Sequence, residues 1–93
     1  MAVLIDELRE YPDSRGPVSH WCHMAADTGF EELHAFAARL GIPRHRFQGD
    51  HYDLPPALRD RALALGAEEV LAGELITRMA GPRGDRVRRR AAG

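Results

Sequence analysis

The sequence predicts an α/β fold: a small, mostly parallel sheet of about four strands, with two main helices and a short third helix. Two observations lead to this prediction. Short apolar segments alternate along the chain with stretches whose apolar residues recur at helical spacing. The order helix, Leu-Gly, strand-like segment also occurs twice, at Leu40-Gly41 and at Leu65-Gly66. Because parallel strands are usually joined through a helix, two such repeats favour parallel pairing.

The composition indicates one small domain, which we place at residues 1–81. The chain has 93 residues and 44% hydrophobic content, enough for one core but not for two. Its formal net charge of −1 excludes the strongly basic balance typical of nucleic-acid-binding proteins. It has a single cysteine, no apolar N-terminal run of the signal-peptide type and no run of roughly twenty apolar residues. We therefore expect a cytoplasmic protein that does not enter a membrane.

Three segments precede the first helix. Residues 2–5 are aliphatic and end at Asp6, which predicts a first strand with an acid at its carboxyl end. Residues 11–17 are rich in turn formers and indicate an exposed loop. Residues 18–26 are nearly apolar apart from His20 and His23, as is typical of a strand covered on both faces.

The first helix is predicted to begin at Thr28, which can form a capping box with Glu31. It is predicted to end at Gly41, a common left-handed terminator, and Pro43 prevents it from resuming. Its apolar residues recur at helical spacing and define one buried face, made up of Phe30, Leu33, Phe36, Ala37 and Leu40.

The second half of the chain contains shorter elements. Residues 44–48 are expected to form a third strand, and residues 49–53 a loop. Pro55 and Pro56 fit only at the start of a helix, which is predicted to bury Leu58, Ala62 and Leu65. A strand at 69–72 and a short helix at 74–80 follow. The Arg-rich residues 82–93 are expected to form a disordered tail.

Four motifs of the chain resemble the domain-of-unknown-function family 4031. In order they are W-C-H-M-A-A-D at 21–27, E-L-H-A-F-A-A-R-L-G at 32–41, F-Q-G-D-H-Y-D-L at 47–54 and A-L-G-A at 64–67. This family consists of small bacterial and phage proteins without an assigned activity, so the resemblance implies no mechanism. Its members tend to carry a hydroxyl residue where this chain has Pro55, a difference that concerns only the local helix cap.

A parallel sheet would gather polar residues at one edge, because the loops at the carboxyl ends of parallel strands converge there. This rule brings together six residues: Asp6, Asp27, Asp50, His51, Asp53 and Glu74. Their carboxylates could hold Mg²⁺ or Mn²⁺. Helix capping or a first-turn position equally explains Asp27, Asp53 and Glu74, which leaves Asp6 and Asp50 as the candidate metal ligands.

From these residues we predict a polar site that binds a phosphorylated or nucleotide-like ligand. His23 and His51 are the candidate catalytic groups, placed to contact or protonate phosphate oxygens. The candidate binding residues are Asp27, His34, Gln48 and Asp53. Two of these histidines also have a structural interpretation: His23 as a buried, hydrogen-bonded histidine, and His34 as a half-exposed residue bordering the apolar helix face. The sequence leaves open whether any reaction is catalysed.

Cys22 and the C-terminal arginines allow other interpretations. Structural zinc is not expected, because alternate residues of a strand face opposite sides and this separates His20 and Cys22 from His23. A buried free thiol explains Cys22 more simply than a nucleophile does. Five arginines lie in the last eleven positions and could attract the phosphates of RNA or DNA. The alternative function is therefore a non-enzymatic interaction module, weakly associated with nucleic acid through this tail.

Overall fold

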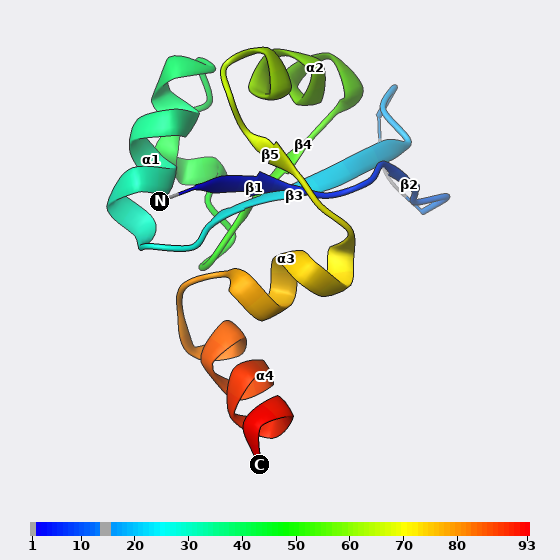
Figure 1. Ribbon diagram of the computed structural model, residues 1–93. Helices are drawn as coiled ribbons and strands as arrows, with labels where there is room; N and C mark the ends of the chain where they lie inside the picture. Colours follow the sequence, from blue (N-terminus) through cyan, green and yellow to red (C-terminus); the bar gives the residue numbers. More distant parts are fainter. Residues whose placement is uncertain (1, 14–15) are drawn as a thin grey trace.

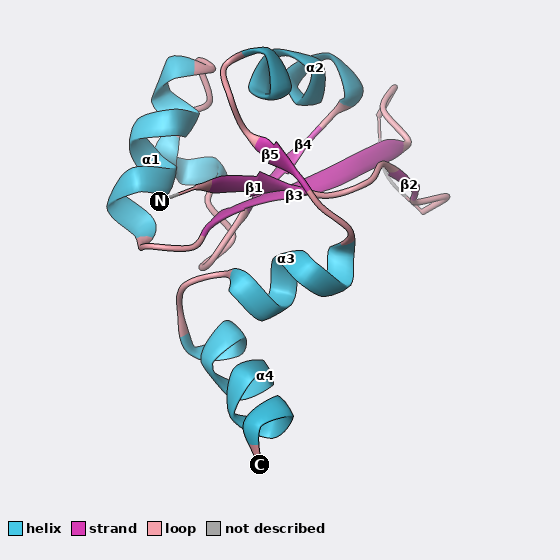
Figure 2. Cartoon of the chain, in the orientation of Figure 1, coloured by secondary structure: helices cyan, strands magenta, loops and turns pink. Residues whose placement is uncertain are grey.

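The computed structural model describes residues 2–13 and 16–93 of the chain (Figure 1). A sheet lies at its centre. Helices α1 (Phe30–Arg39) and α2 (Pro56–Ala64) cover one face of the sheet, and α3 (Ala72–Arg78) covers part of the other. The last helix, α4 (Pro82–Ala92), packs against α3 and projects away from the sheet (Figure 2).

Strand β3 organises the sheet. The five strands in the described residues are β1 (Val3–Ile5), β2 (Arg9–Glu10), β3 (His20–Ala26), β4 (Tyr52–Leu54) and β5 (Glu68–Glu69). β1 and then β2 each pair antiparallel with β3 along the same edge, and β4 pairs antiparallel with the other edge of β3. β5 pairs with β1 in parallel. The sheet is therefore mixed and mostly antiparallel.

The predicted α/β class is confirmed, but the prediction of a mostly parallel sheet is wrong. Residues 44–48 do not form a strand, because Arg44–Arg46 is a single turn of 3-10 helix. The strand comes later, at β4, after a turn in which the Gln48 N–H donates to the His51 carbonyl at 2.8 Å. This turn reverses the chain, and β4 returns antiparallel to β3. The Leu-Gly signals mark helix ends, but they carry no information about the direction of the next strand.

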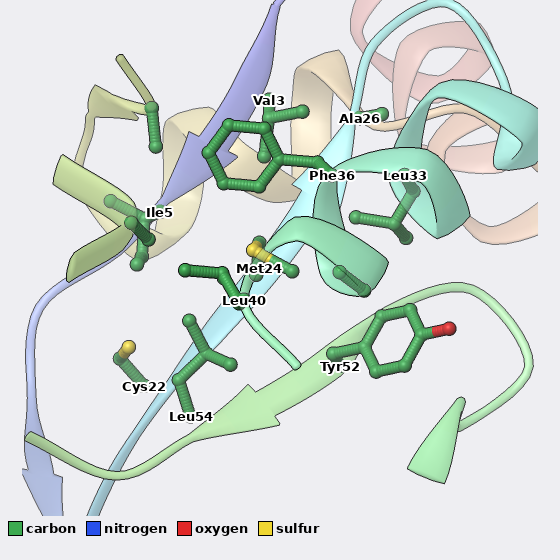
Figure 3. Close-up of a cluster of buried hydrophobic side chains, with 13 residues drawn as sticks. Val3, Ile5, Cys22, Met24, Ala26, Leu33, Phe36, Leu40, Tyr52 and Leu54 are labelled. Carbon is green, nitrogen blue, oxygen red and sulfur yellow. The ribbon is translucent and has the colours of Figure 1, made fainter. Parts of the chain in front are cut away.

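The main core lies between the sheet and helices α1 and α2 (Figure 3). Alternate residues of the strands point into it: Val3, Ile5, Cys22, Met24, Ala26, Tyr52 and Leu54. The buried face predicted for the first helix is confirmed at Leu33, Phe36, Ala37 and Leu40. Leu65, predicted to be buried, is exposed because it lies at the C-cap of α2, beyond the last turn that packs on the sheet.

A second, smaller core lies on the other face of the sheet. There Leu4 and Ala25 pack against Val70, Leu75 and Met79. Because α3 covers only this part of the face, the outward side chains of β4 and of the first half of β3 lie outside both cores. They line the cavity described below.

Other contacts replace the predicted helix caps. α1 begins at Phe30 rather than at Thr28, and its N-cap residue, Gly29, has no side chain. Thr28 instead bonds the Glu32 carboxylate. α2 begins after Pro55, also without a side-chain cap. Its predicted cap, Asp53, is consequently available for other contacts.

Residues 82–92 form helix α4, where the composition predicts a disordered tail. Pro82 occupies the first turn, where its fixed φ suits a helix. The Arg88 guanidinium donates to the Thr77 and Met79 carbonyl oxygens, 2.8 and 2.9 Å away, at the end of α3. Gly84 packs so closely that a Cβ there would lie 2.0 Å from the Met79 carbonyl oxygen. Contacts with α3 thus order a segment whose composition alone favours disorder.

Every helix in the described ranges is too short or too polar to span a bilayer.

Candidate functional site

β3 and β4 place polar side chains on the face of the sheet opposite the main core. His23 lies directly across from Asp53 in the antiparallel register. His51 lies two residues before Asp53, and Trp21 two residues before His23. Residues two apart in a strand share a face. The polar cluster and the main core are therefore the two sides of one strand pair.

Asp6 fixes the His23 side chain. Asp6 follows β1 and is only 1% exposed. Its Oδ1 accepts the backbone N–H of His23 at 2.6 Å, and its Oδ2 lies 2.8 Å from the His23 Nδ1. Both oxygens of this carboxylate are bonded, as the burial of a charged group requires. The arrangement leaves His23 Nε2 as the ring nitrogen available to a ligand.

Two carboxylates hold the His51 ring. Its Nδ1 lies 2.7 Å from Asp50 Oδ1, and its Nε2 lies 3.2 Å from Asp53 Oδ1. The His23 and His51 rings meet edge to face, with centroids 5.2 Å apart. Arg83, in the first turn of α4, bonds both oxygens of Asp50 at 3.0 and 3.1 Å. The last helix of the chain therefore supports the site through Asp50.

These contacts set the charge of the cluster. Hydrogen bonding to Asp53, and secondarily to Asp50, raises the pKa of His51 above its ordinary value although burial acts in the opposite direction. The same bond with His51 lowers the pKa of Asp53. Both shifts favour an imidazolium beside a carboxylate in this pair.

A cavity of about 530 Å³ opens beside the cluster. It is lined by His23, His51, Asp53 and Gln48, together with Tyr11, Asp13, Trp21 and Arg46. Small-molecule sites commonly have volumes of roughly 300–1,000 Å³. The cavity has a size suited to a small ligand, and it combines two aromatic side chains with a guanidinium group and the polar cluster.

Six of the predicted site residues lie together. Four of them line the cavity, and Asp6 and Asp50 lie behind the histidines, each beside a ring Nδ1. The antiparallel pairing brings them together, because it sets Asp6, at the end of β1, beside the middle of β3. The turn before β4 then adds the residues from Gln48 to Asp53.

Asp27 and His34 lie away from the cavity. Asp27 follows β3 and therefore lies beside the start of β1, where its Oδ1 accepts the Ala2 N–H at 2.8 Å. This bond is the main cause of the lowered pKa of Asp27, and the nearby Arg78 adds to it. His34 lies on α1, on the core side of the sheet, where its Nδ1 bonds the Tyr52 hydroxyl at 2.8 Å.

Glu74, the last of the six residues expected at the parallel edge, forms an ion pair with Arg78 on α3. It lies one turn before Arg78 on the helix, and it does not line the 530 Å³ cavity.

Cys22 lies in the main core (Figure 3). As the neighbour of His23 in β3, it points to the opposite face of the sheet from the cluster. Burial raises the pKa of its thiol to about 12, so the thiolate that a nucleophile requires is scarce at neutral pH. The structure thus gives Cys22 the environment of a packing residue.

Sequence reasoning missed several residues around the site. Trp21, Tyr11 and Arg46 line the cavity, and Arg83 holds Asp50. The spacing of Trp21 from His23 is a usable signal, since residues two apart in a strand share a face. Arg83 had no such signal, because it lies in a segment predicted to be disordered.

The cluster offers two kinds of chemistry. An imidazole oriented by a carboxylate can transfer protons to or from a bound ligand. In addition, His23, His51 and Asp53 each offer one ligand atom for a metal ion, and these atoms lie within 4.8 Å of one another.

Comparison with known proteins gives a family but no function. Neither a curated protein nor a solved structure matches the chain. The family model described as "protein of unknown function (DUF4031)" matches residues 3–81, from β1 to the loop before α4. All the cavity residues and both supporting carboxylates, Asp6 and Asp50, lie within the matched region. The chain therefore belongs to the DUF4031 family, as its four motifs predict.

Proposed function

We propose that this protein binds a phosphorylated, nucleotide-like small molecule in the cavity beside β3 and β4. The observation that carries the proposal is the composition of the cavity lining. Trp21 and Tyr11 supply aromatic surface, while Arg46, His51 and Gln48 supply a guanidinium, an imidazole and an amide. A planar base and a phosphate group are the chemical partners of these two sets of side chains.

Each part of the ligand has a distinct partner in this proposal. The base packs on aromatic surface, which stabilises stacked rings without requiring a particular base. The phosphate accepts hydrogen bonds from Arg46 and, where it displaces the Asp53 carboxylate from His51 Nε2, from the His51 ring. Gln48 can donate and accept, so it contacts a sugar hydroxyl or a phosphate oxygen.

The same geometry supports acid–base chemistry on the bound ligand. Asp6 orients His23 and leaves its Nε2 available, and the hydrogen bonds to Asp53 and Asp50 raise the pKa of His51. His23 is therefore suited to accept a proton and His51 to donate one to a phosphate oxygen.

The sole tryptophan provides a direct test. Because Trp21 is the chain's one tryptophan and lines the cavity, its fluorescence reports occupancy without a label. Titration with AMP, GMP and inorganic phosphate should quench it saturably. Arg46→Gln should weaken AMP binding by about 10–100-fold, since a hydrogen bond to a charged group contributes about 1.5–3 kcal/mol.

Arg44→Gln is the matched control. Arg44 belongs to the same 3-10 turn as Arg46 but does not line the cavity. This variant should bind AMP like the wild type. If millimolar nucleotides leave the Trp21 signal unchanged, or if both variants lose affinity equally, the proposed function is refuted.

A second candidate function, association with nucleic acid, is favoured by one feature of α4. The side chains of Arg86, Arg89 and Arg90 form no ion pair or hydrogen bond within the described part of the chain, and α4 projects from the body of the molecule (Figure 2). Deleting residues 84–93 should abolish retention on RNA or DNA at low salt if α4 makes the contacts. Retention that survives this deletion contradicts the α4 version of this function.

A further inference from the structure

We propose that His23, His51 and Asp53 bind one divalent transition-metal ion that is open to the cavity and receives the phosphate of the ligand. The identity of that phosphate partner rests on the proposed function, whereas the metal site itself rests on the cluster. The arguments concern the ligand atoms, the groups behind them and the charge of the cavity.

The ligand atoms already lie near one another. One atom from each of the three residues lies within 4.8 Å of the others. A tetrahedral ion with bonds of about 2.0–2.1 Å needs its ligands roughly 3.3 Å apart. The Asp53 side chain is 40% exposed and has room to rotate toward an ion, while Asp6 holds His23 in place. The backbone register that sets His23 opposite Asp53 does not need to change.

The groups behind the histidines are those of a metal site. Asp6 Oδ2 lies 2.8 Å from the Nδ1 of His23, and Asp50 Oδ1 lies 2.7 Å from the Nδ1 of His51. A carboxylate on Nδ1 fixes the ring and leaves Nε2 to ligate, a pattern shared by most metal-binding histidines. Both histidines of the cluster have it. Asp6 and Asp50, the metal-ligand candidates of the sequence, act here as orienting groups instead.

The charge of the cavity favours an ion. Two carboxylates, Asp13 and Asp53, line the cavity and would repel a phosphate. A divalent ion at the cluster reverses this local charge and gives the phosphate an electrophilic partner. Its position is between His51 Nε2 and Asp53 Oδ1, which lie 3.2 Å apart.

The ligand set also selects the metal. Two imidazoles and one carboxylate suit Zn²⁺, Mn²⁺ or Fe²⁺, whereas Mg²⁺ prefers oxygen ligands and keeps its waters. Three protein ligands leave at least one coordination position for water or substrate, as in catalytic rather than structural sites.

The test is calorimetric titration of chelator-treated protein with Zn²⁺, Mn²⁺ and Mg²⁺, without any organic ligand. Zn²⁺ should bind one ion per chain, and Mg²⁺ should bind at least tenfold more weakly. His23→Gln and Asp53→Asn should each lower Zn²⁺ affinity at least tenfold. Asp50→Asn should lower it about 10–100-fold, as is typical of orienting groups. The melting temperature of each variant confirms that it is folded.

His45→Gln is the matched control, because His45 is exposed and lies outside the cluster. It should bind Zn²⁺ like the wild type. Absence of Zn²⁺ binding at millimolar metal, or binding that survives both His23→Gln and Asp53→Asn, overturns the proposal.

Failure of this inference is distinguishable from failure of the proposed function. Stoichiometric Zn²⁺ binding with no response to AMP supports the metal site and refutes the nucleotide ligand. AMP binding that is unaffected by Zn²⁺ or by chelator refutes the metal's role and supports the proposed function.

Discussion

Replacing Asp6 separates its structural role from its role at the site. Asp6→Ala removes Oδ1, which accepts the His23 backbone N–H at 2.6 Å, and Oδ2, which lies 2.8 Å from His23 Nδ1. Leaving one buried donor unpaired costs about 1–3 kcal/mol, and losing a hydrogen bond to a charged group costs about 1.5–3 kcal/mol. We therefore expect Asp6→Ala to lower the free energy of unfolding by about 2–5 kcal/mol, a large share of a small domain's stability.

Asp6→Asn should be much less destabilising, because its amide oxygen can still accept the His23 N–H. Its amide nitrogen, however, donates to Nδ1 and forces the proton of neutral His23 onto Nε2. Urea unfolding monitored by circular dichroism measures the stability, and ¹⁵N NMR of the imidazole identifies the tautomer. The expected result is a folded Asp6→Asn protein with Nε2 protonated and Zn²⁺ affinity reduced at least tenfold. Equal destabilisation by Asn and Ala, or an unchanged tautomer in the Asn variant, refutes this account of Asp6.

Three further predictions concern the scaffold. Leu40→Ala should lower the free energy of unfolding, measured in urea, by about 2–5 kcal/mol because Leu40 is buried in the main core. The exposed control Leu65→Ala should lower it by less than about 0.5 kcal/mol. Equal losses in the two variants would show that the buried face of α1 is misassigned. The pKa of Asp27 is lowered in the folded state. The ionised carboxylate therefore stabilises the fold above its unfolded pKa of about 3.9, and this stabilisation is lost as the pH falls through its folded pKa. The stability gap between wild type and Asp27→Asn should therefore shrink in acid below about pH 4, and a gap independent of pH contradicts this. Gly84→Ala should undock α4 and cost at least about 1 kcal/mol, because its Cβ would meet the Met79 carbonyl oxygen at 2.0 Å; an unchanged melting temperature is the contrary result.

Local signals in the sequence predicted the elements that are regular over several turns. The first helix shows five apolar residues at helical spacing and a terminating Gly41. Four of these residues are buried as predicted, and Phe30, at the start of the helix, is only partly buried. β3 is long enough for its composition to identify it, and its alternation already separated Cys22 from His23. These features depend only on residues close in sequence.

The direction and pairing of the short strands depend on contacts that the sequence does not encode locally. Tyr52–Leu54 has only three residues, too few to show a period, while Arg44–Gln48 has no signal that separates a strand from a 3-10 turn. The predicted strand lies before Gly49, whereas β4 lies after it. This difference reverses the inferred direction of the strand, which is why the sequence favoured parallel pairing.

The candidate site was predicted in part because two different topologies bring some of the same residues together. Asp6, Asp50, His51 and Asp53 follow strand ends in a parallel sheet. In the antiparallel one Asp6 bonds His23, while Asp50 and Asp53 bond the adjacent His51. Asp27 is the residue that distinguishes the two. It lies at the opposite end of the sheet because β3 runs antiparallel to β1.

A crystal structure of the protein grown with AMP and Zn²⁺ tests the central claim most directly. The account predicts the AMP phosphate in the cavity beside Arg46 and His51, the base near Trp21, and anomalous density for zinc among His23, His51 and Asp53. Zinc–nitrogen distances should be about 2.0–2.1 Å. Ligand density elsewhere on the surface, or an empty cavity at saturating AMP, would contradict the assignment of this cavity as the functional site.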